Sequence, residues 1–262
     1  MTASLVVVGT GIKLISHLTA EAKAYIEQSD KVLYLVNEPA MKAWIKSMNS
    51  NAESLDNLYS SCQLRKDSYL AITEYILKTL HANQHVCVVL YGHPSVYAKP
   101  ALDAAIIAKQ EGYFAKILPG ISSEDCLFAD LLIDPATHGC LSFEATDLLV
   151  HQRKIDISCH VIIWQVSVIG MLGHIKNYDN SRGIRLLYNY ICKHYPLNHE
   201  MISYTASQYP GLNPKIIKFN LDQMQDKMFS RISTLYIPPF QKNVCDKKML
   251  AELEINLDDM RI

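Results

Sequence analysis

Short apolar runs alternate with helix-like patterns through the first half of the chain. The runs predict strands, and between them apolar residues recur every three or four positions, as in amphipathic helices. The expected strands are residues 5–9, 31–36, 86–92 and 115–118, and the expected helices lie near 17–29, 38–48, 61–82 and 97–111. Most of these strands are continuously apolar, which is typical of a parallel sheet covered on both faces. We therefore expect an α/β domain with a parallel-rich sheet.

The second half begins after the turn Pro119-Gly120, where the strand–helix alternation is interrupted. Closer spacing of the later strands predicts a mixed sheet. The expected elements are a short helix at 122–132, strands at 160–166, 201–206, 215–221 and 234–237, and a helix near 184–195. Two domains fit a length of 262 residues. We place an N-terminal domain at 1–120, a C-terminal α/β domain at 121–239 and a charged, mildly helical tail at 240–262.

Composition narrows the class of protein. Hydrophobic residues make up 49% and charged residues 19%, which is enough apolar material for a folded core. Twenty-five basic against 26 acidic residues disfavour a nucleic-acid partner. Apolar runs such as 86–91 are far shorter than the roughly 18 residues of a membrane span. The N-terminus lacks a basic signal-peptide start, and the seven cysteines form no C-x-x-C pair. We expect a cytoplasmic protein without a disulfide framework.

Three glycine-containing turns follow the predicted strands. The first turn carries Gly9 and Gly11, but Leu14 stands where a dinucleotide fingerprint requires glycine, and the chain contains no P-loop. The others are 91–94 and 119–124, the last with Ser122 or Ser123 as the cap of a helix. Each turn alone is typical of an ordinary connection between a strand and a helix. Together they favour a small-molecule site at the carboxyl ends of the strands.

A tyrosine–arginine set lies around the start of the helix at 61–82. Arg65 and Tyr69 are one helical turn apart, and Tyr59 precedes the expected cap at Ser60 or Ser61. A guanidinium beside a phenol stabilises the phenolate and lowers the phenol pKa, which suits a general base. The alternative is a surface arginine with two half-buried tyrosines.

The order of these motifs resembles the tetrapyrrole methylase superfamily of S-adenosylmethionine-dependent methyltransferases. The segments that carry the resemblance are G-T-G at 9–11, Y-G-H-P-S-V-Y at 91–97 and P-G-I-S-S-E-D at 119–125. Further segments resemble the borosin peptide-backbone α-N-methyltransferases more specifically. These are F-A-D at 128–130, D-P-A-T-H-G-C at 134–140, E-A-T-D at 144–147, I-W-Q-V at 163–166 and S-T-L-Y-I-P-P at 233–239.

The resemblance implies an enzyme with a two-domain fold and the cofactor cleft between the domains. The cofactor would be S-adenosylmethionine, released as S-adenosylhomocysteine, and no metal is implied. The implied catalytic residues are Tyr59, Arg65, Tyr69 and Tyr91, with Tyr69 and Tyr59 acting on the amide proton and Arg65 stabilising phenolate or oxyanion charge. The implied cofactor-binding residues are Tyr91, His93, Val96, Tyr97, Ser122, Gln165, Tyr204, Ser233 and Thr234.

Family members that carry their own substrate continue well beyond the residue that corresponds to Ile262. We therefore expect the split type, which iteratively methylates a separate precursor with a helical recognition domain and an apolar core. A homodimer, and a heterotetramer with the precursor, are implied by the family. The alternatives are an enzyme acting on a tetrapyrrole, a diphthamide precursor or RNA, and a non-catalytic cofactor-binding regulator. A zinc enzyme is disfavoured, because Asn83 is expected to end the helix between His81 and His85.

Overall fold

The computed structural model describes residues 3–82, 85–175, 177–241 and 244–257. The helix end expected at Asn83 and the last five residues of the tail lie outside these ranges. The chain divides into two compact units, each described by itself. Unit 1 comprises Met1–Asp130, Met171–Asn177 and Ala206–Pro214, and unit 2 comprises the remaining segments. The domain boundary expected at residue 120 stays a prediction.

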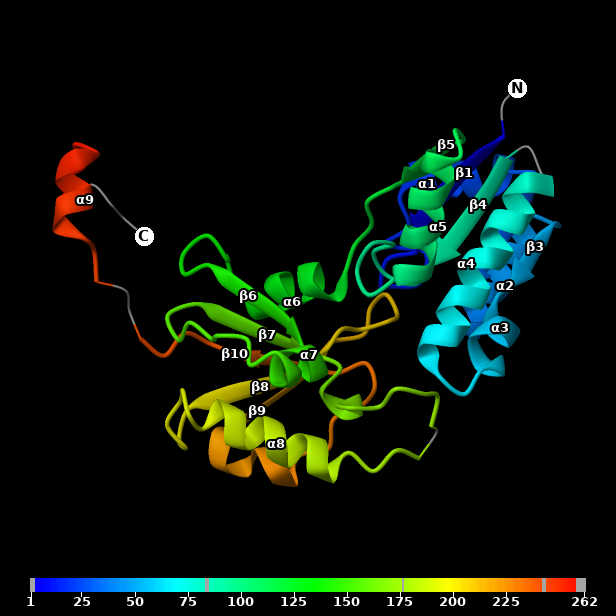
Figure 1. Cartoon of the computed structure of the whole chain (residues 1–262). Helices are drawn as coiled ribbons and strands as arrows, with labels where there is room; N and C mark the ends of the chain where they lie inside the picture. The colour runs from blue at the N-terminus through cyan, green and yellow to red at the C-terminus, as the bar shows by residue number, and fades with distance from the viewer. Residues whose placement is uncertain (1–2, 83–84, 176, 242–243, 258–262) are drawn as a thin grey trace. The chain divides into compact units, whose positions relative to one another are not determined.

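Unit 1 contains a five-stranded parallel sheet in the order β3-β2-β4-β1-β5 (Figure 1). The strands are β1 (Ser4–Gly9), β2 (Lys31–Leu35), β3 (Ala52–Ser54), β4 (His85–Leu90) and β5 (Phe114–Ile117). The helices are α1 (Ala20–Gln28), α2 (Pro39–Met48), α3 (Asp56–Ser61), α4 (Arg65–Ala82), α5 (Lys99–Gln110) and α6 (Ser123–Leu131). The parallel sheet and its four longer strands confirm the sequence prediction.

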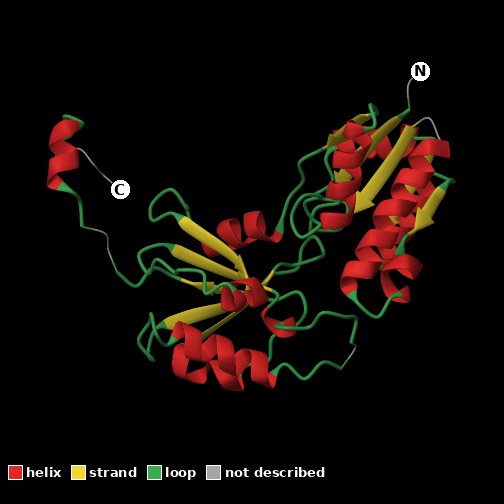
Figure 2. Cartoon of the chain, in the orientation of Figure 1, coloured by secondary structure: helices red, strands yellow, loops and turns green. Residues whose placement is uncertain are grey.

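Alternate residues of each strand enter different cores, which explains the continuous apolar runs. Leu5 and Val7 of β1 pack in a core with α4 and α5, whereas Val6 and Val8 pack in a core with α1 and α2. Helices therefore cover both faces of the sheet. Because each strand residue is buried on one face or the other, the strands are apolar along their whole length. Figure 2 shows the strands of this unit between the two helical layers.

Unit 2 contains a mixed sheet in the order β6-β7-β10-β8-β9, of which only the β6–β7 pair is parallel. The strands are β6 (Cys140–Glu144), β7 (His160–Trp164), β8 (Glu200–Thr205), β9 (Lys215–Asn220) and β10 (Thr234–Ile237). The other elements are α7 (Ala145–Val150), α8 (Ser181–Ile191), the 3₁₀ turns Val166–Val168 and Leu221–Asp226, and α9 (Lys247–Glu252). One core joins α7 and α8 to the sheet. The mixed sheet is confirmed.

The structure corrects the expected helix at 61–82. Tyr59 lies on a separate short helix, α3, and α4 begins only at Arg65. Cys62 is extended, and Leu64 forms an antiparallel bridge with Gly173, more than 100 residues further along the chain. Extended residues that pair with a distant segment cannot continue a helix. The break therefore results from a tertiary contact, which the local sequence pattern cannot predict.

Three further observations bear on the class of protein. Within the described residues, no helix is long and apolar enough to cross a membrane. The seven cysteines all lie within the described ranges, and none of them is in a disulfide. In the tail, α9 buries none of its residues.

Candidate functional site

The three glycine turns meet at the carboxyl edge of the parallel sheet of unit 1. Gly11 and Gly92 form an antiparallel bridge, with N–H to carbonyl distances of 3.1 and 3.2 Å. A Cβ added at Gly9 would lie 2.1 Å from the Gly92 carbonyl oxygen, and one at Gly120 would lie 3.3 Å from the same atom. The glycines therefore allow the three turns to pack backbone against backbone.

A small pocket, with room for roughly one water molecule, lies beside these turns within unit 1. Its wall combines residues that follow β1, β2 and β4: Thr10, Ile12, Leu14, Val36, Glu38, Met41 and Tyr91. The chain leaves β2 towards β3 on one side and leaves β4 towards β5 on the other, so these neighbouring strands diverge. Ligands of open α/β sheets bind where adjacent connections diverge. Of this wall, only Tyr91 was predicted from the sequence as a site residue.

A distant segment, Ala206–Pro214, is held against the pocket wall. The Leu14 N–H donates to the Gln208 carbonyl at 2.8 Å, and the Gln208 side-chain amide donates to the Tyr91 hydroxyl at 3.4 Å. The Tyr209 hydroxyl donates to the Glu38 carboxylate. Three of the residues that line the pocket are thus bonded to one segment, which no local sequence signal could have paired with them.

Tyr91 lies at the end of β4 with its backbone N–H donated to the Leu35 carbonyl at 3.2 Å. Its side chain is half-buried, and burial raises the pKa of the Tyr91 phenol. The hydrogen bond from Gln208 opposes that shift, whereas Cys126 and Glu38 add to it. Tyr91 is therefore a protonated hydroxyl near neutral pH, able to donate a hydrogen bond.

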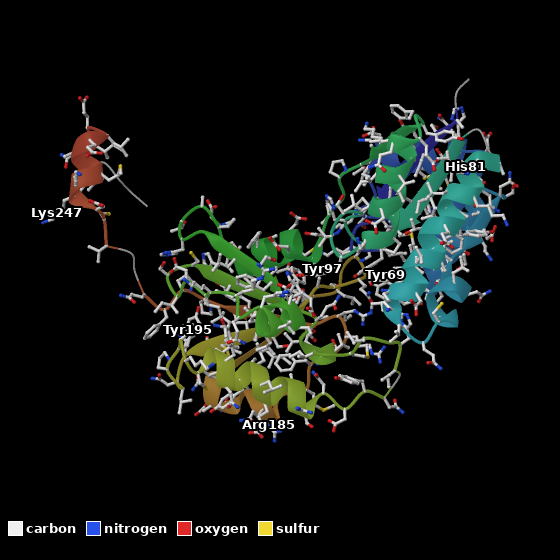
Figure 3. The ribbon with its side chains drawn as sticks, viewed as in Figure 1. Tyr69, His81, Tyr97, Arg185, Tyr195 and Lys247 are labelled. Atoms are coloured by element: carbon white, nitrogen blue, oxygen red, sulfur yellow. The ribbon has the colours of Figure 1, made fainter. Side chains whose placement is uncertain are left out.

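Tyr59, Arg65 and Tyr69 form a cluster, as the sequence predicts. The Tyr59 and Tyr69 rings stack with centroids 6.4 Å apart and planes at 29°, and the Arg65 side chain hydrogen-bonds to Tyr69. The cluster lies at the carboxyl edge of the sheet, because α3 and α4 follow the end of β3. Figure 3 shows Tyr69 on α4 at the end opposite His81.

The expected direction of the Tyr69 pKa shift is wrong. Burial raises the pKa of the Tyr69 phenol, the neighbouring Tyr59 raises it further, and Arg65 lowers it without reversing the net shift. Desolvation disfavours the phenolate more than the single guanidinium favours it. Arg65 therefore offsets part of a burial effect that the sequence could not reveal.

His174 joins this cluster and was not predicted. Its ring contacts Tyr59 with centroids 4.5 Å apart, and its Nε2 lies 3.1 Å from the Ser68 hydroxyl. The segment Met171–Asn177 that carries it is anchored on α4, since the Arg65 N–H donates to the Leu172 carbonyl at 2.8 Å. A Cβ at Gly173 would lie 2.5 Å from the Gln63 carbonyl oxygen, so glycine permits this approach.

The loop after β4 carries four of the cofactor candidates. Tyr97 has a positive φ of 53°, which is uncommon for a bulky side chain and is found preferentially at functional sites. Val96 and Tyr97 are exposed by 41% and 47%, and His93 accepts the Ser95 N–H through Nδ1 at 3.1 Å. Exposed aromatic and apolar surfaces held by a strained loop suit contact with a flat ligand.

Four further candidates lie in unit 2 and differ in accessibility. Gln165 directly follows β7, is half-buried and has a φ of 56°. Tyr204 has no exposed surface, and Ser233 and Thr234 are buried. The Ser233 hydroxyl is engaged by the Ser230 N–H at 2.9 Å, the Ser230 hydroxyl at 2.6 Å and the Thr205 hydroxyl at 3.3 Å. Of these four, Gln165 presents the accessible polar side chain.

Ser122 caps α6. Its hydroxyl accepts the Asp125 N–H at 3.2 Å, and the Asp125 carboxylate accepts the Ser122 N–H at 2.6 Å and the Ser122 hydroxyl at 2.7 Å. This reciprocal pair satisfies donors that the helix leaves open at its start. The expectation that Ser122 or Ser123 begins this helix is confirmed for Ser122.

We expect Ser122→Ala to lower the free energy of unfolding by about 1 kcal/mol, because the cap is lost. Denaturant unfolding measures the change, with Ser122→Thr as the conservative control that retains a hydroxyl. Unchanged stability combined with weaker binding of S-adenosylhomocysteine would instead assign the hydroxyl to the ligand.

His81 and His85, which were considered as zinc ligands, contact different residues. His81 Nε2 lies 2.8 Å from the Glu111 carboxylate, and His85 Nδ1 lies 2.8 Å from the Ser4 hydroxyl. Among the residues that the structure describes, no three or more histidine, cysteine or acidic side chains form a group that could hold a metal ion.

The sequence matches a known family over more than half of the chain. The sequence profile described as Tetrapyrrole (Corrin/Porphyrin) Methylases matches residues 4–161, a range that includes all three glycine turns and the tyrosine–arginine cluster. The chain belongs to this family, as the resemblance in its motifs indicated.

Relatives within the family are named as borosin or cyclic-peptide proteins. The methyltransferase/gymnopeptides precursor of Gymnopus fusipes is 38% identical over 96% of this chain and 61% of its own length. The methyltransferase/type I borosin cyclic peptide precursor of Coprinopsis marcescibilis is 39% identical over 98% of this chain and 66% of its own length. The chain thus spans about three fifths of the length of the first of these relatives, and the borosin resemblance is confirmed.

Solved structures share the architecture at low sequence identity. Uroporphyrin-III-C-methyltransferase from Thermus thermophilus gives a TM-score of 0.65 at 14% identity, covering 91% of this chain and 93% of that chain. Its complex with S-adenosylhomocysteine gives 0.60 at 13%, covering 90% and 92%. Diphthine synthase gives 0.62 at 12%, covering 92% of each. These likenesses establish the two-domain α/β fold.

Proposed function

We propose that the chain is an S-adenosylmethionine-dependent methyltransferase that iteratively methylates backbone amide nitrogens of a ribosomally made precursor peptide. The observation that carries the proposal is the cluster of Tyr59, Arg65 and Tyr69, with a guanidinium hydrogen-bonded to a half-buried phenol. The names of the relatives, which combine a methyltransferase with a cyclic-peptide precursor, support a peptide as the acceptor.

The chemistry explains why such a cluster is needed. The lone pair of a peptide nitrogen is delocalised into the carbonyl, so the nitrogen is a poor nucleophile. In our proposal the Tyr69 phenolate accepts the N–H proton, with Tyr59 beside it, while Arg65 stabilises the negative charge on that phenolate before the transfer or on the carbonyl oxygen after it. Tyr91, which lines the pocket, would contact both the cofactor and the substrate. The nitrogen then forms its bond to the methyl carbon as the bond from that carbon to sulfur breaks.

S-adenosylmethionine supplies an electrophilic methyl group on a sulfonium when bound. Its adenine and methionine parts require flat apolar surfaces and a few polar groups. The accessible residues with this chemistry are His93, Val96, Tyr97 and Gln165. We propose these as its principal contacts, and we retain Tyr91, Ser122, Tyr204, Ser233 and Thr234 as candidates with less accessible side chains.

We further propose that the precursor is a separate molecule with a helical recognition domain and an apolar core. All of the residues proposed for catalysis lie within this chain, so the chemistry calls on no residue of the precursor. A homodimer, and a heterotetramer with two precursors, would be the working assembly. Sedimentation with and without the precursor tests this assembly.

The experiment that tests the function is methyl transfer in trans. The chain is incubated with S-adenosylmethionine and the short precursor encoded nearest to it, and intact mass spectrometry follows the precursor. We expect a ladder of precursor masses that differ by one methyl group, which distinguishes iterative from single transfer. An unmodified precursor, together with calorimetric binding of S-adenosylhomocysteine, would instead point to a tetrapyrrole or another acceptor.

A further inference from the structure

The two tyrosines of the proposed catalytic cluster lie on different helices. Tyr59 is on α3 and Tyr69 is on α4, and the chain between these helices is extended at Cys62. The two rings nevertheless stack with centroids 6.4 Å apart. Because no continuous helix joins the two residues, the position of one ring against the other depends on side-chain packing.

His174 contacts both helices with one side chain. Its ring lies against Tyr59 with centroids 4.5 Å apart and planes at 59°, a separation at which aromatic rings attract each other. Its Nε2 lies 3.1 Å from the hydroxyl of Ser68, which precedes Tyr69 on α4. Ser68 has no exposed surface, so packing fixes this contact point on α4. His174 thus links the helix of Tyr59 to the helix of Tyr69.

The backbone beside His174 is held at the break between α3 and α4. Gly173 forms an antiparallel bridge with Leu64, and the Arg65 N–H donates to the Leu172 carbonyl at 2.8 Å. The histidine therefore follows a segment that is hydrogen-bonded to the chain directly before α4 and to the first residue of α4. These bonds fix the point from which the ring reaches Tyr59.

We infer that His174 is a positioning residue that holds the Tyr59 ring against Tyr69. It acts through Tyr59 and Ser68 and not on the substrate. The inference rests on the proposed function, in which Tyr69 accepts the amide proton with Tyr59 beside it, and it adds a residue on which the geometry of that pair depends. Misplacement of a reacting group by about 1 Å can reduce a rate by about 10²-fold, so loss of this support should be visible in the rate.

Removal of His174 should also change the ionisation of Tyr69. Besides burial, two groups act on the Tyr69 phenol: Tyr59 on α3 raises its pKa, and Arg65 on α4 lowers it. When Tyr59 withdraws, its influence is lost and the pKa of Tyr69 should fall. The alkaline rise of the methyl-transfer rate should then level off at a lower pH than in the unaltered protein. Arg65→Ala should shift this profile in the opposite direction, which distinguishes the two variants.

The test measures single-turnover methyl transfer to the precursor by mass spectrometry, as a function of pH, with the unaltered protein and His174→Ala. We expect the variant to lose roughly 10- to 100-fold in rate at neutral pH. Calorimetry with S-adenosylhomocysteine should give an affinity close to that of the unaltered protein, because His174 acts on the tyrosine pair and not on the cofactor.

A double-mutant cycle tests whether His174 acts through Tyr59. Tyr59→Ala removes the ring that His174 positions, so adding His174→Ala to it should change the rate by less than about twofold. A histidine that acts independently of Tyr59 would lower the rate of Tyr59→Ala by the same factor as it lowers that of the unaltered protein. That result would overturn the inference.

Two conservative variants separate the contacts of His174 and replace His174→Ala if thermal unfolding shows that it does not fold. His174→Phe keeps a ring for Tyr59 and loses the bond to Ser68, whereas His174→Gln keeps a hydrogen-bonding group for Ser68 and loses the ring. We expect His174→Phe to be the faster of the two, because the ring contact positions Tyr59 directly. A rate for His174→Phe no higher than that for His174→Gln would overturn the inference.

His81→Ala is the matched control. His81 lies at the end of α4 opposite Tyr69 (Figure 3), and it also combines a ring contact with a polar contact. Its ring lies 5.5 Å from that of Tyr113, centroid to centroid, and its Nε2 lies 2.8 Å from the Glu111 carboxylate. The control removes similar contacts from the same helix without touching the cluster, so its rate and pH profile should equal those of the unaltered protein.

The outcomes separate this inference from the proposed function. Folded His174→Ala with an unaltered rate and pH profile, or with weakened binding of S-adenosylhomocysteine, would overturn the role of His174 and leave the function intact. Absence of methyl transfer by the unaltered protein, despite binding of S-adenosylhomocysteine, would overturn the proposed function and this inference with it.

Discussion

Tyr69→Phe should reduce the rate of methyl transfer by about 10²–10⁴-fold, the usual contribution of a positioned proton acceptor. The substitution removes one oxygen from the cluster of Tyr59, Arg65 and Tyr69 and leaves the ring that stacks on Tyr59. Single-turnover mass spectrometry measures the rate, and calorimetry with S-adenosylhomocysteine measures binding. We expect the affinity to stay close to that of the unaltered protein.

Tyr75→Phe is the matched control for this prediction. Tyr75 lies on the same helix, but its hydroxyl bonds to the Glu53 carboxylate at 2.5 Å rather than to the cluster. The control should transfer methyl groups at nearly the unaltered rate. If Tyr69→Phe loses its affinity for S-adenosylhomocysteine along with its rate, Tyr69 belongs to the cofactor site and our assignment is wrong.

Arg65→Ala should have the second largest effect, a loss of roughly 10²–10³-fold, as for removal of a donor that stabilises developing charge. Arg65 opposes the effect of burial on the Tyr69 phenol, so its removal should raise the pKa of Tyr69 further. Lys66→Ala controls for the loss of a positive charge, because Lys66 is an exposed cation at the next position. The variants are compared in single-turnover assays.

The pH dependence of the single-turnover rate follows from the direction in which the Tyr69 pKa is shifted. Because the pKa of Tyr69 lies above its ordinary value, the phenolate is the minor form at neutral pH. Its fraction rises about tenfold per pH unit until the pKa is reached. The single-turnover rate should therefore rise with pH through the alkaline range, and the rise should continue to higher pH in Arg65→Ala. A rate independent of pH would identify Tyr69 as a hydrogen-bond donor rather than a base.

The parallel sheet could be predicted because the burial of its strands on both faces leaves a continuous apolar run in the sequence of each strand. Each strand of unit 1 sends alternate residues such as Val6 and Val7 into different cores, so both must be apolar and the run is visible in the sequence. In unit 2, β6 and α7 were missed, because β6 is only half-buried and α7 is only six residues long. Neither element has enough buried residues to generate a clear period.

The candidate site was predictable in part for a related reason. Arg65 and Tyr69 are neighbours on one helix, so their spacing predicts their contact. His174 and Gln208 reach the site from distant segments, and no spacing can indicate that. The direction of the Tyr69 pKa shift was also missed, because desolvation depends on everything that packs around the phenol and not on its sequence neighbour alone.

The measurement that tests the account most directly is tandem mass spectrometry of the separate precursor after incubation with the protein and S-adenosylmethionine, with Tyr69→Phe in parallel. Fragment masses distinguish a methyl group on a backbone nitrogen from one on a side chain. Our account predicts successive backbone N-methyl groups on the apolar core with the unaltered protein, and an almost unmodified precursor with the variant. Methyl groups on side chains, or equal backbone methylation by Tyr69→Phe, would contradict it.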